Sequence, residues 1–166
     1  MMKRLLLFVA TIFALTVGTV IAQQRIAVIP FTNADGKMEN NVLCYQFQDN
    51  LQKELAKLDS DGKYFKLVPA DSIENLLAQL NIDPRNPQYE SDLWRAVKML
   101  NVQSVVTGNF NIQSDKIVVN AFVYNARTKM PNRKHQAIDI FKDKTTPMAA
   151  IPDIIEGLKP LLIPAE

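Results

Sequence analysis

The sequence predicts an α/β fold of the α+β type, in which one mixed β-sheet of about five strands carries packed helices. Three observations support this prediction. The run 26–31 is apolar at every position, as in a central strand covered on both faces. Apolar residues then recur with helical spacing up to Leu100, and with a spacing of two from Val102 onward. The resulting order is β-α-β-α-α-β-β-β-α, with the helices expected mainly on one side of the sheet.

The first strand, 26–31, is followed by a turn and a long helix. The turn 32–36 ends in Gly36, which can take a positive φ angle. The helix is expected over 39–58, where Cys44 falls on one apolar stripe with Phe47, Leu51, Leu55 and Leu58. Buried packing is therefore the favoured interpretation of Cys44, with a reactive or dimer-forming thiol as the alternative.

A short strand and two further helices come next. The strand is expected over 64–68, and Asp71 and Glu74 then have the spacing of a capping box for a helix with inward Ile73, Leu76, Leu77 and Leu80. A third helix is expected next, and its residues expected to face inward are Tyr89, Leu93, Val97 and Leu100. Trp94 lies beside this last stripe and is interpreted as a half-buried flank of the core rather than a platform for a ligand.

The second half of the domain is predicted to be a hairpin, a third strand and a last helix. Residues 102–112 and 116–126 alternate with period two and are separated by a short break, which is typical of a hairpin. A third strand is expected over 134–141, with Ile138 and Ile140 facing inward. The closing segment, 148–162, has a helical pattern interrupted by Pro152, Gly157 and Pro160.

Residues 1–22 are expected to be a secretory signal peptide. Lys3 and Arg4 precede an apolar run, and a small-residue exit ends at Ala22, after which cleavage is predicted. An uncleaved membrane anchor is the alternative. The position after the cut is Gln23, not the cysteine that a lipoprotein needs, so no lipid anchor is expected. We therefore expect one domain over 23–166, in the periplasm or secreted.

Charge and composition narrow the class of partner. The chain is 48% hydrophobic and 22% charged, values typical of a globular domain. Its 19 Lys and Arg residues exceed its 17 Asp and Glu residues only through Lys3 and Arg4, so no nucleic-acid binding is expected. A local excess of cations is interpreted as a solvated edge, with a partner-binding patch as the alternative; it comprises Arg127, Lys129, Arg133, Lys134, Lys142 and Lys144.

The residue inventory gives no catalytic, cofactor-binding or metal-binding residue to name. His135 is the only histidine and Cys44 the only cysteine, so a zinc site is not expected, and neither a nucleophile turn nor a phosphate-binding loop is present. The stretches 33–36 and 59–62 mimic calcium loops but lack carboxylates at the first and twelfth places, and are interpreted as turns. A pair of carboxylates, as in a glycosidase, stays open. The preferred prediction is that the protein is not an enzyme.

Two segments resemble the periplasmic TolB amino-terminal-like domains. RIAVIPF at 25–31 resembles the group's "IAVLPF" opening, and 96–128 resembles its "A..L.A..VV.G.......V.V...V.D..TG" segment. The wider group includes the CsgG curli secretion subunit, the flagellar protein FlgO and the LpoB activator of a peptidoglycan synthase. This resemblance, over about 25–141, implies a small sheet-and-helix domain used for protein contact in the cell envelope, with no family catalytic residue to carry over.

The chain also departs from these relatives. We expect no β-propeller after the domain, no long amphipathic hairpin that could build a pore, and no lipidated cysteine. A pore-forming or outer-membrane-anchored role is therefore not expected.

The preferred function is a periplasmic, non-catalytic binding or scaffold module that contacts envelope proteins. One alternative is a homo-oligomeric subunit of a secretion or surface-organelle assembly, and another is a small periplasmic enzyme or peptidoglycan-binding domain. The candidate contact residues are Phe122 and Tyr124 on the outer side of the hairpin, flanked by Arg127 and Arg133. The alternative for the two aromatic residues is a place beneath one of the helices.

Overall fold

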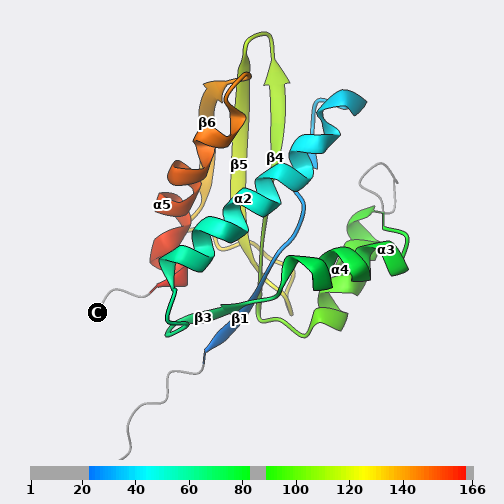
Figure 1. Ribbon diagram of the computed structural model, residues 1–166, viewed down its shortest axis with the longest axis vertical. Helices are drawn as coiled ribbons and strands as arrows, with labels where there is room; N and C mark the ends of the chain where they lie inside the picture. The colour runs from blue at the N-terminus through cyan, green and yellow to red at the C-terminus, as the bar shows by residue number, and fades with distance from the viewer. Residues whose placement is uncertain (1–22, 83–88, 164–166) are drawn as a thin grey trace, which may run out of the picture.

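The computed structural model describes residues 23–82 and 89–163, which form one mixed sheet with helices against it (Figure 1). The signal peptide predicted over 1–22 lies outside the described residues. The strand order is β3-β1-β4-β5-β6, and β2 pairs with β4 beyond the end of β1. The strands are β1 (Gln24–Val28), β2 (Thr32–Asn33), β3 (Phe65–Leu67), β4 (Ser104–Gln113), β5 (Lys116–Asn125) and β6 (Ala137–Asp143).

The sheet is mixed because its two halves are built from different connections. The strands β1, β3 and β4 run parallel and are joined through helices, whereas β4, β5 and β6 are antiparallel neighbours. The helical segments are η1 (Met38–Asn41), α2 (Val42–Leu58), α3 (Ala70–Gln79), α4 (Tyr89–Leu100), η2 (Pro147–Ala150) and α5 (Ile151–Leu162). This order confirms the predicted fold class, with β2 as an added short strand. Within the two described ranges, no helix combines the length and the apolar character needed to cross a membrane.

Helices cover both faces of the sheet, so the expectation of helices mainly on one side is wrong. Alternate residues of β1 point to opposite faces. Ile26 and Val28 belong to a buried cluster with α2 and α5, while Ala27 and Ile29 belong to a second cluster with α3 and α4. The apolar run 26–31, which begins in β1 and continues past its end, requires this arrangement, because a central segment without polar side chains must be covered on both sides.

Helix α2 is fixed to the sheet by its apolar stripe and by two glutamines. Cys44 and Phe47 are fully buried, which confirms the packing interpretation of Cys44. The Phe47 ring lies 5.2 Å from that of Phe31. One turn apart, Gln48 donates a hydrogen bond from Nε2 to the Val28 carbonyl oxygen at 3.0 Å, and Gln52 donates one to the Val68 carbonyl oxygen at 3.1 Å. The glutamines thus satisfy carbonyl groups where β1 and β3 end.

Two local predictions are wrong. No capping box forms at α3, because the helix begins at Ala70 after Pro69 and no side chain caps its first turn. Ile138 does not face the core but is 53% exposed. A bulge in the pairing of β5 with β6 and a φ of 55° at Asp139 turn this residue outward, whereas Ile140 packs against the core.

One part of the sheet has a helix on only one face. In Figure 1, α2 crosses the long hairpin of β4 and β5 and α5 lies along β6 beside β5, whereas α3 and α4 lie together beside the lower end of the hairpin. On the side of α3 and α4, Asn111 and Val118 are partly exposed, and Phe141 of the edge strand β6 is 63% exposed. The boundary between the covered and the open part of this face lies at α4, where the candidate site is found.

Candidate functional site

A row of three aromatic rings marks the edge of the covered part of the sheet. The Trp94 ring, on α4, meets the Tyr124 ring edge-on at 5.7 Å between centroids, and the Tyr124 ring meets that of Phe122 at 6.0 Å. Both contacts have the near-perpendicular geometry that aromatic pairs favour. Phe122 and Tyr124 share a face of β5 because they are two residues apart. All three side chains are partly exposed, so the row presents aromatic surface to solvent.

The row borders a cavity of about 420 Å³ between α4 and the sheet, which we call the aromatic groove. Its lining includes the three rings together with Leu93, Ile29 and Asn109. The amide oxygen of Asn109 accepts a hydrogen bond from Asn120 at 2.9 Å, and the Asn120 oxygen in turn accepts one from the Asp139 backbone at 2.8 Å. These polar groups therefore hydrogen-bond to one another, and the aromatic rings supply much of the apolar lining of the groove.

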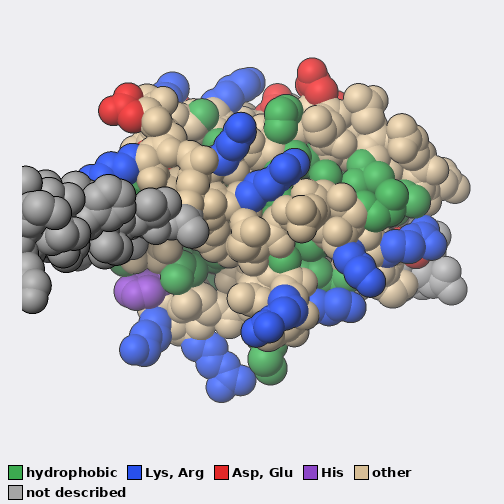
Figure 2. All heavy atoms as spheres, turned by 90° about the horizontal axis from the view of Figure 1, so that it is seen from below, with side chains coloured by type: hydrophobic (Ala, Val, Ile, Leu, Met, Phe, Trp, Pro, Cys, Tyr) green, Lys and Arg blue, Asp and Glu red, His purple; other side chains and the backbone are tan. Residues whose placement is uncertain are grey.

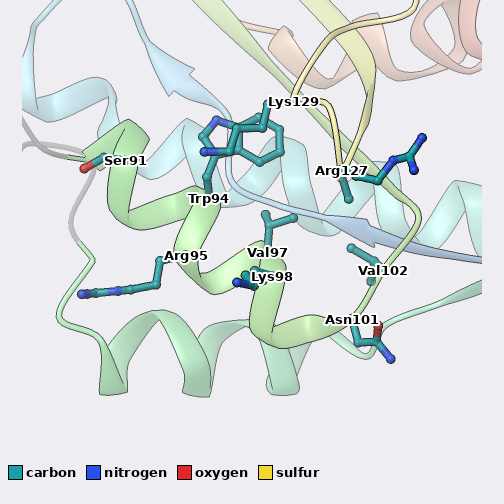
Figure 3. A pocket seen from close by; sticks show the side chains of 10 residues that line it. Ser91, Trp94, Arg95, Val97, Lys98, Asn101, Val102, Arg127 and Lys129 are labelled. Carbon is teal, nitrogen blue, oxygen red and sulfur yellow. The ribbon is translucent and has the colours of Figure 1, made fainter.

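A second cavity, of about 620 Å³, lies on the other side of Trp94 and is called the basic hollow. Trp94, Val97, Val102 and Ala126 give it an apolar lining, and Ser91 and Asn101 add polar groups. Its cations are Arg95, Lys98, Arg127 and Lys129, and its described lining contains no Asp or Glu. Figure 3 shows Lys129 over the Trp94 ring, and Arg95 and Arg127 directed to opposite sides. The distance from Lys129 Nζ to the ring centroid is 5.9 Å, a cation–π contact.

The turn after β5 holds two of these cations in place. The Asn125 side-chain oxygen accepts hydrogen bonds from the backbone N–H groups of Arg127 at 3.0 Å and Thr128 at 2.9 Å. The Lys129 N–H bonds the Asn125 carbonyl oxygen at 2.8 Å, with a φ of 59° at Lys129. The Ala126 N–H bonds the Gln103 carbonyl oxygen at 2.9 Å and ties the turn to the start of β4. The turn therefore presents its cations from a fixed backbone.

The structure brings together three of the four residues that the sequence suggested. Phe122 and Tyr124 line the aromatic groove and Arg127 lines the basic hollow, whereas Arg133 is exposed in the same connection but lines neither cavity. The contact of Tyr124 with Trp94 fits the alternative of a place beneath a helix, and Phe122 lies farther out. Their role in binding a partner stays a prediction.

Sequence reasoning missed the contribution of α4. Trp94 does pack against the core cluster, as interpreted, but it also separates the two cavities. Arg95 and Lys98 stand 29 or more positions before Arg127, so only the fold brings them together. A signal was present, because Ser91, Trp94, Arg95, Lys98 and Asn101 recur at intervals of three and four on one helical face.

The described lining of the two cavities consists of apolar, aromatic, neutral polar and cationic side chains. Their described lining contains no His, Cys, Asp or Glu. Across the described ranges, no three such side chains gather as a metal site would require.

Figure 2 shows the lower end of the molecule, where Lys and Arg side chains are spread over the visible face and Asp and Glu side chains lie near its edges. On this face, cationic side chains therefore lie among apolar ones.

The fold is shared with solved structures of small bacterial domains that combine one sheet with packed helices. No family model matches the sequence, and no curated protein matches it. Among solved structures, the LpoB C-terminal domain from Salmonella enterica aligns with a TM-score of 0.51 at 14% identity, over 82% of this chain and 93% of that one. The NMR structure of Escherichia coli LpoB gives a TM-score of 0.53 at 15% identity, over 76% of this chain and 60% of that one.

A third solved structure with the same fold is lipoprotein GNA1162 from Neisseria meningitidis. It aligns with a TM-score of 0.50 at 12% identity, over 86% of this chain and 99% of that one. These similarities confirm the resemblance to the group that contains LpoB at the level of the fold. At such low identity they carry no residue role to this chain.

Proposed function

We propose that this chain is a non-catalytic protein-binding module that acts in a cell-envelope assembly. The observation that carries the proposal is the row of Trp94, Tyr124 and Phe122, partly exposed along a groove and flanked by cations. Aromatic and arginine side chains are enriched in protein interfaces and supply a large share of their binding energy. The fold shared with LpoB and with a neisserial lipoprotein supports an envelope role.

We further propose that the domain works in the periplasm or outside the cell, after cleavage behind Ala22. The basic start, apolar run and small-residue exit of residues 1–22 support export. Amino-terminal sequencing of the protein from its own host tests this proposal. A first residue of Gln23 in the periplasmic or culture fraction is expected, and a cytoplasmic protein that keeps Met1 would contradict it.

The binding role is tested by cross-linking the tagged protein in its own host, followed by a pull-down and mass spectrometry. We expect a reproducible envelope protein with the wild type and recovery reduced about tenfold or more with Phe122→Ala, because an aromatic anchor contributes roughly 2 kcal/mol or more. Met38→Ala is the matched control, since Met38 is 68% exposed on η1 and lines neither cavity. Circular dichroism checks that both variants are folded. Equal recovery with all three proteins would contradict the proposed site.

A homo-oligomeric subunit is the second candidate, favoured by the outer edge of the sheet. Among the strands that the structure describes, β6 pairs only with β5, and Ile138 and Phe141 are 53% and 63% exposed beside this edge. Such an edge can pair with another copy. Analytical ultracentrifugation separates the candidates: a monomer supports the binding module, whereas an oligomer that Phe141→Lys disrupts supports the subunit.

A further inference from the structure

The basic hollow concentrates cations within a chain that is otherwise balanced in charge. Apart from Lys3 and Arg4, Lys and Arg equal Asp and Glu in number. Four cations nevertheless line one cavity whose described lining has no acid. Segregation of one sign of charge in a concave site raises the local potential and favours ligands of the opposite sign. The hollow is thus suited to negative charge although the domain as a whole is not.

Three of these four cations form no ion pair within the described residues. Arg95 is paired with Asp92 at 3.4 Å, but Lys98, Arg127 and Lys129 have no acidic partner in the described part of the chain. Some lysines elsewhere do have one, as in the pair of Lys142 with Asp153 at 2.7 Å. The unpaired cations are also held by α4 and by the Asn125 turn, so little order must be imposed on the backbone when an anion binds.

The shape of the site indicates an extended occupant. The basic hollow and the aromatic groove measure about 620 and 420 Å³ and share the Trp94 side chain. Each is as large as a site for a small ligand, so a single phosphate or carboxylate would fill only part of one. Both are concave, whereas a bilayer is flat and meets cations that protrude. A segment of polypeptide, with carboxylates at one end and an apolar side chain at the other, matches both cavities.

Resting on the proposed function, we propose that the basic hollow and the aromatic groove together bind one acidic segment of the partner protein. Carboxylates of the segment contact Lys98, Arg127 and Lys129, and an apolar or aromatic side chain passes Trp94 and packs against Phe122 in the groove. This assigns the partner a chemical class and gives the two cavities separate roles: the hollow selects charge and the groove supplies apolar contact.

The test places a photo-crosslinking amino acid at Met130, which is 62% exposed and follows Lys129 directly. The same group at Met38 is the control. After irradiation in the host, mass spectrometry identifies the partner peptide joined to residue 130. We expect one partner and a peptide rich in Asp and Glu. We also expect the double change Arg127→Glu and Lys129→Glu to lower the cross-linking yield at least about tenfold, because it places like charges in contact. Both residues are exposed, so the folded state should persist.

A reciprocal change makes the result specific. Replacing the acidic residues of the captured segment by lysine should abolish cross-linking to the wild type and restore it to the doubly reversed variant. Restoration is expected only if the charges meet directly. Binding measured with the purified partner should also weaken as sodium chloride rises, since exposed charges are screened.

The remaining outcomes separate failure of this inference from failure of the proposed function. A protein partner captured through a neutral segment, or one indifferent to the charge reversal, would overturn the acidic-segment proposal and leave a binding module. Capture of no protein from either position would overturn both. Flotation with phosphatidylglycerol vesicles is the last experiment. If no protein partner is captured, and the wild type binds these vesicles while the doubly reversed variant does not, the basic hollow would be assigned to a membrane surface instead.

Discussion

Replacing Gln48 by methionine tests how α2 is joined to the sheet. Gln48 is 1% exposed, and its Nε2 donates to the Val28 carbonyl oxygen at 3.0 Å. The Val68 N–H bonds the Ile26 carbonyl oxygen, so the Val28 carbonyl points to the same side, where β3 has already ended at Leu67. Methionine keeps nearly the same volume but has no donor, and the carbonyl group is left buried without a partner.

The expected cost follows from the hydrogen bond and the stranded carbonyl. A typical internal hydrogen bond contributes about 0.5–1.5 kcal/mol, and an unsatisfied buried group costs about 1–3 kcal/mol. Methionine offsets part of this through its apolar burial, so we expect a net loss of about 1–3 kcal/mol in the free energy of unfolding. For a protein of this size each kcal/mol lowers Tm by roughly 2–4 °C, which gives a decrease of roughly 2–12 °C.

The assay is urea and thermal unfolding of purified protein, followed by circular dichroism. Gln46→Met is the matched control, because Gln46 is exposed on the same helix and a surface substitution there should change stability by about 0.5 kcal/mol or less. Equal midpoints for Gln48→Met and Gln46→Met would refute the reasoning, since the hydrogen bond would then contribute nothing that the methionine side chain does not replace.

Three further predictions concern other parts of the fold. Burial raises the pKa of the Cys44 thiol from 9.0 to about 11, so the thiol should react with a disulfide reagent at pH 8 only as fast as the protein opens. Because the pKa is higher in the folded state, the wild type should lose stability relative to Cys44→Val as the pH rises from about 9 to about 11. Gly108→Ala should cost at least about 2 kcal/mol in urea unfolding, because the new Cβ would lie 1.9 Å from a backbone carbonyl oxygen of β5. Gly36→Ala has open space around it but a φ of +71°, and should cost about 1 kcal/mol. Equal losses of stability in the two variants would show that the close approach at Gly108 does not limit stability. Asp59→Ala should lower stability by about 1–3 kcal/mol and speed hydrogen exchange in β3, because its carboxylate accepts three backbone N–H bonds of 2.7–2.9 Å, and Asp61→Ala should have little effect in the same experiments.

The sequence predicts most of the elements because their signals are local. The positive φ expected at Gly36 is present at +71°, and helix α5 forms over most of the expected range although Pro152 and Pro160 lie in it. Pro152 is tolerated because it stands in the first turn, where its missing N–H has no intrahelical partner. Ile138 was assigned to the wrong face because a bulge shifts the alternation, and period two carries no sign of an inserted residue.

The site could be predicted only in part, because it depends on which helix covers which face. The choice of Phe122 and Tyr124 needed only the alternation of one strand. Placing Trp94 beside them requires α4 to lie on the same face, which the one-sided arrangement expected from sequence did not specify. Arg127 lies beside the cations of α4 because of the turn at Asn125. The hydrogen bonds that the Asn125 side chain accepts set the path of the backbone in this turn.

The open surface beyond Trp94 follows from the lengths of the elements. Each strand of the β4–β5 hairpin has ten residues and spans roughly 33 Å, whereas the twelve residues of α4 span about 18 Å. A helix of that length that also has to cover β1 cannot cover the whole hairpin. Beyond it, Asn109 and Asn120 hydrogen-bond to each other across the strands, as befits a wet face, and Phe122 is the large apolar side chain at the boundary. A solvated face has no structural need for an aromatic ring there, which is why Phe122 is the residue whose replacement best separates binding from folding.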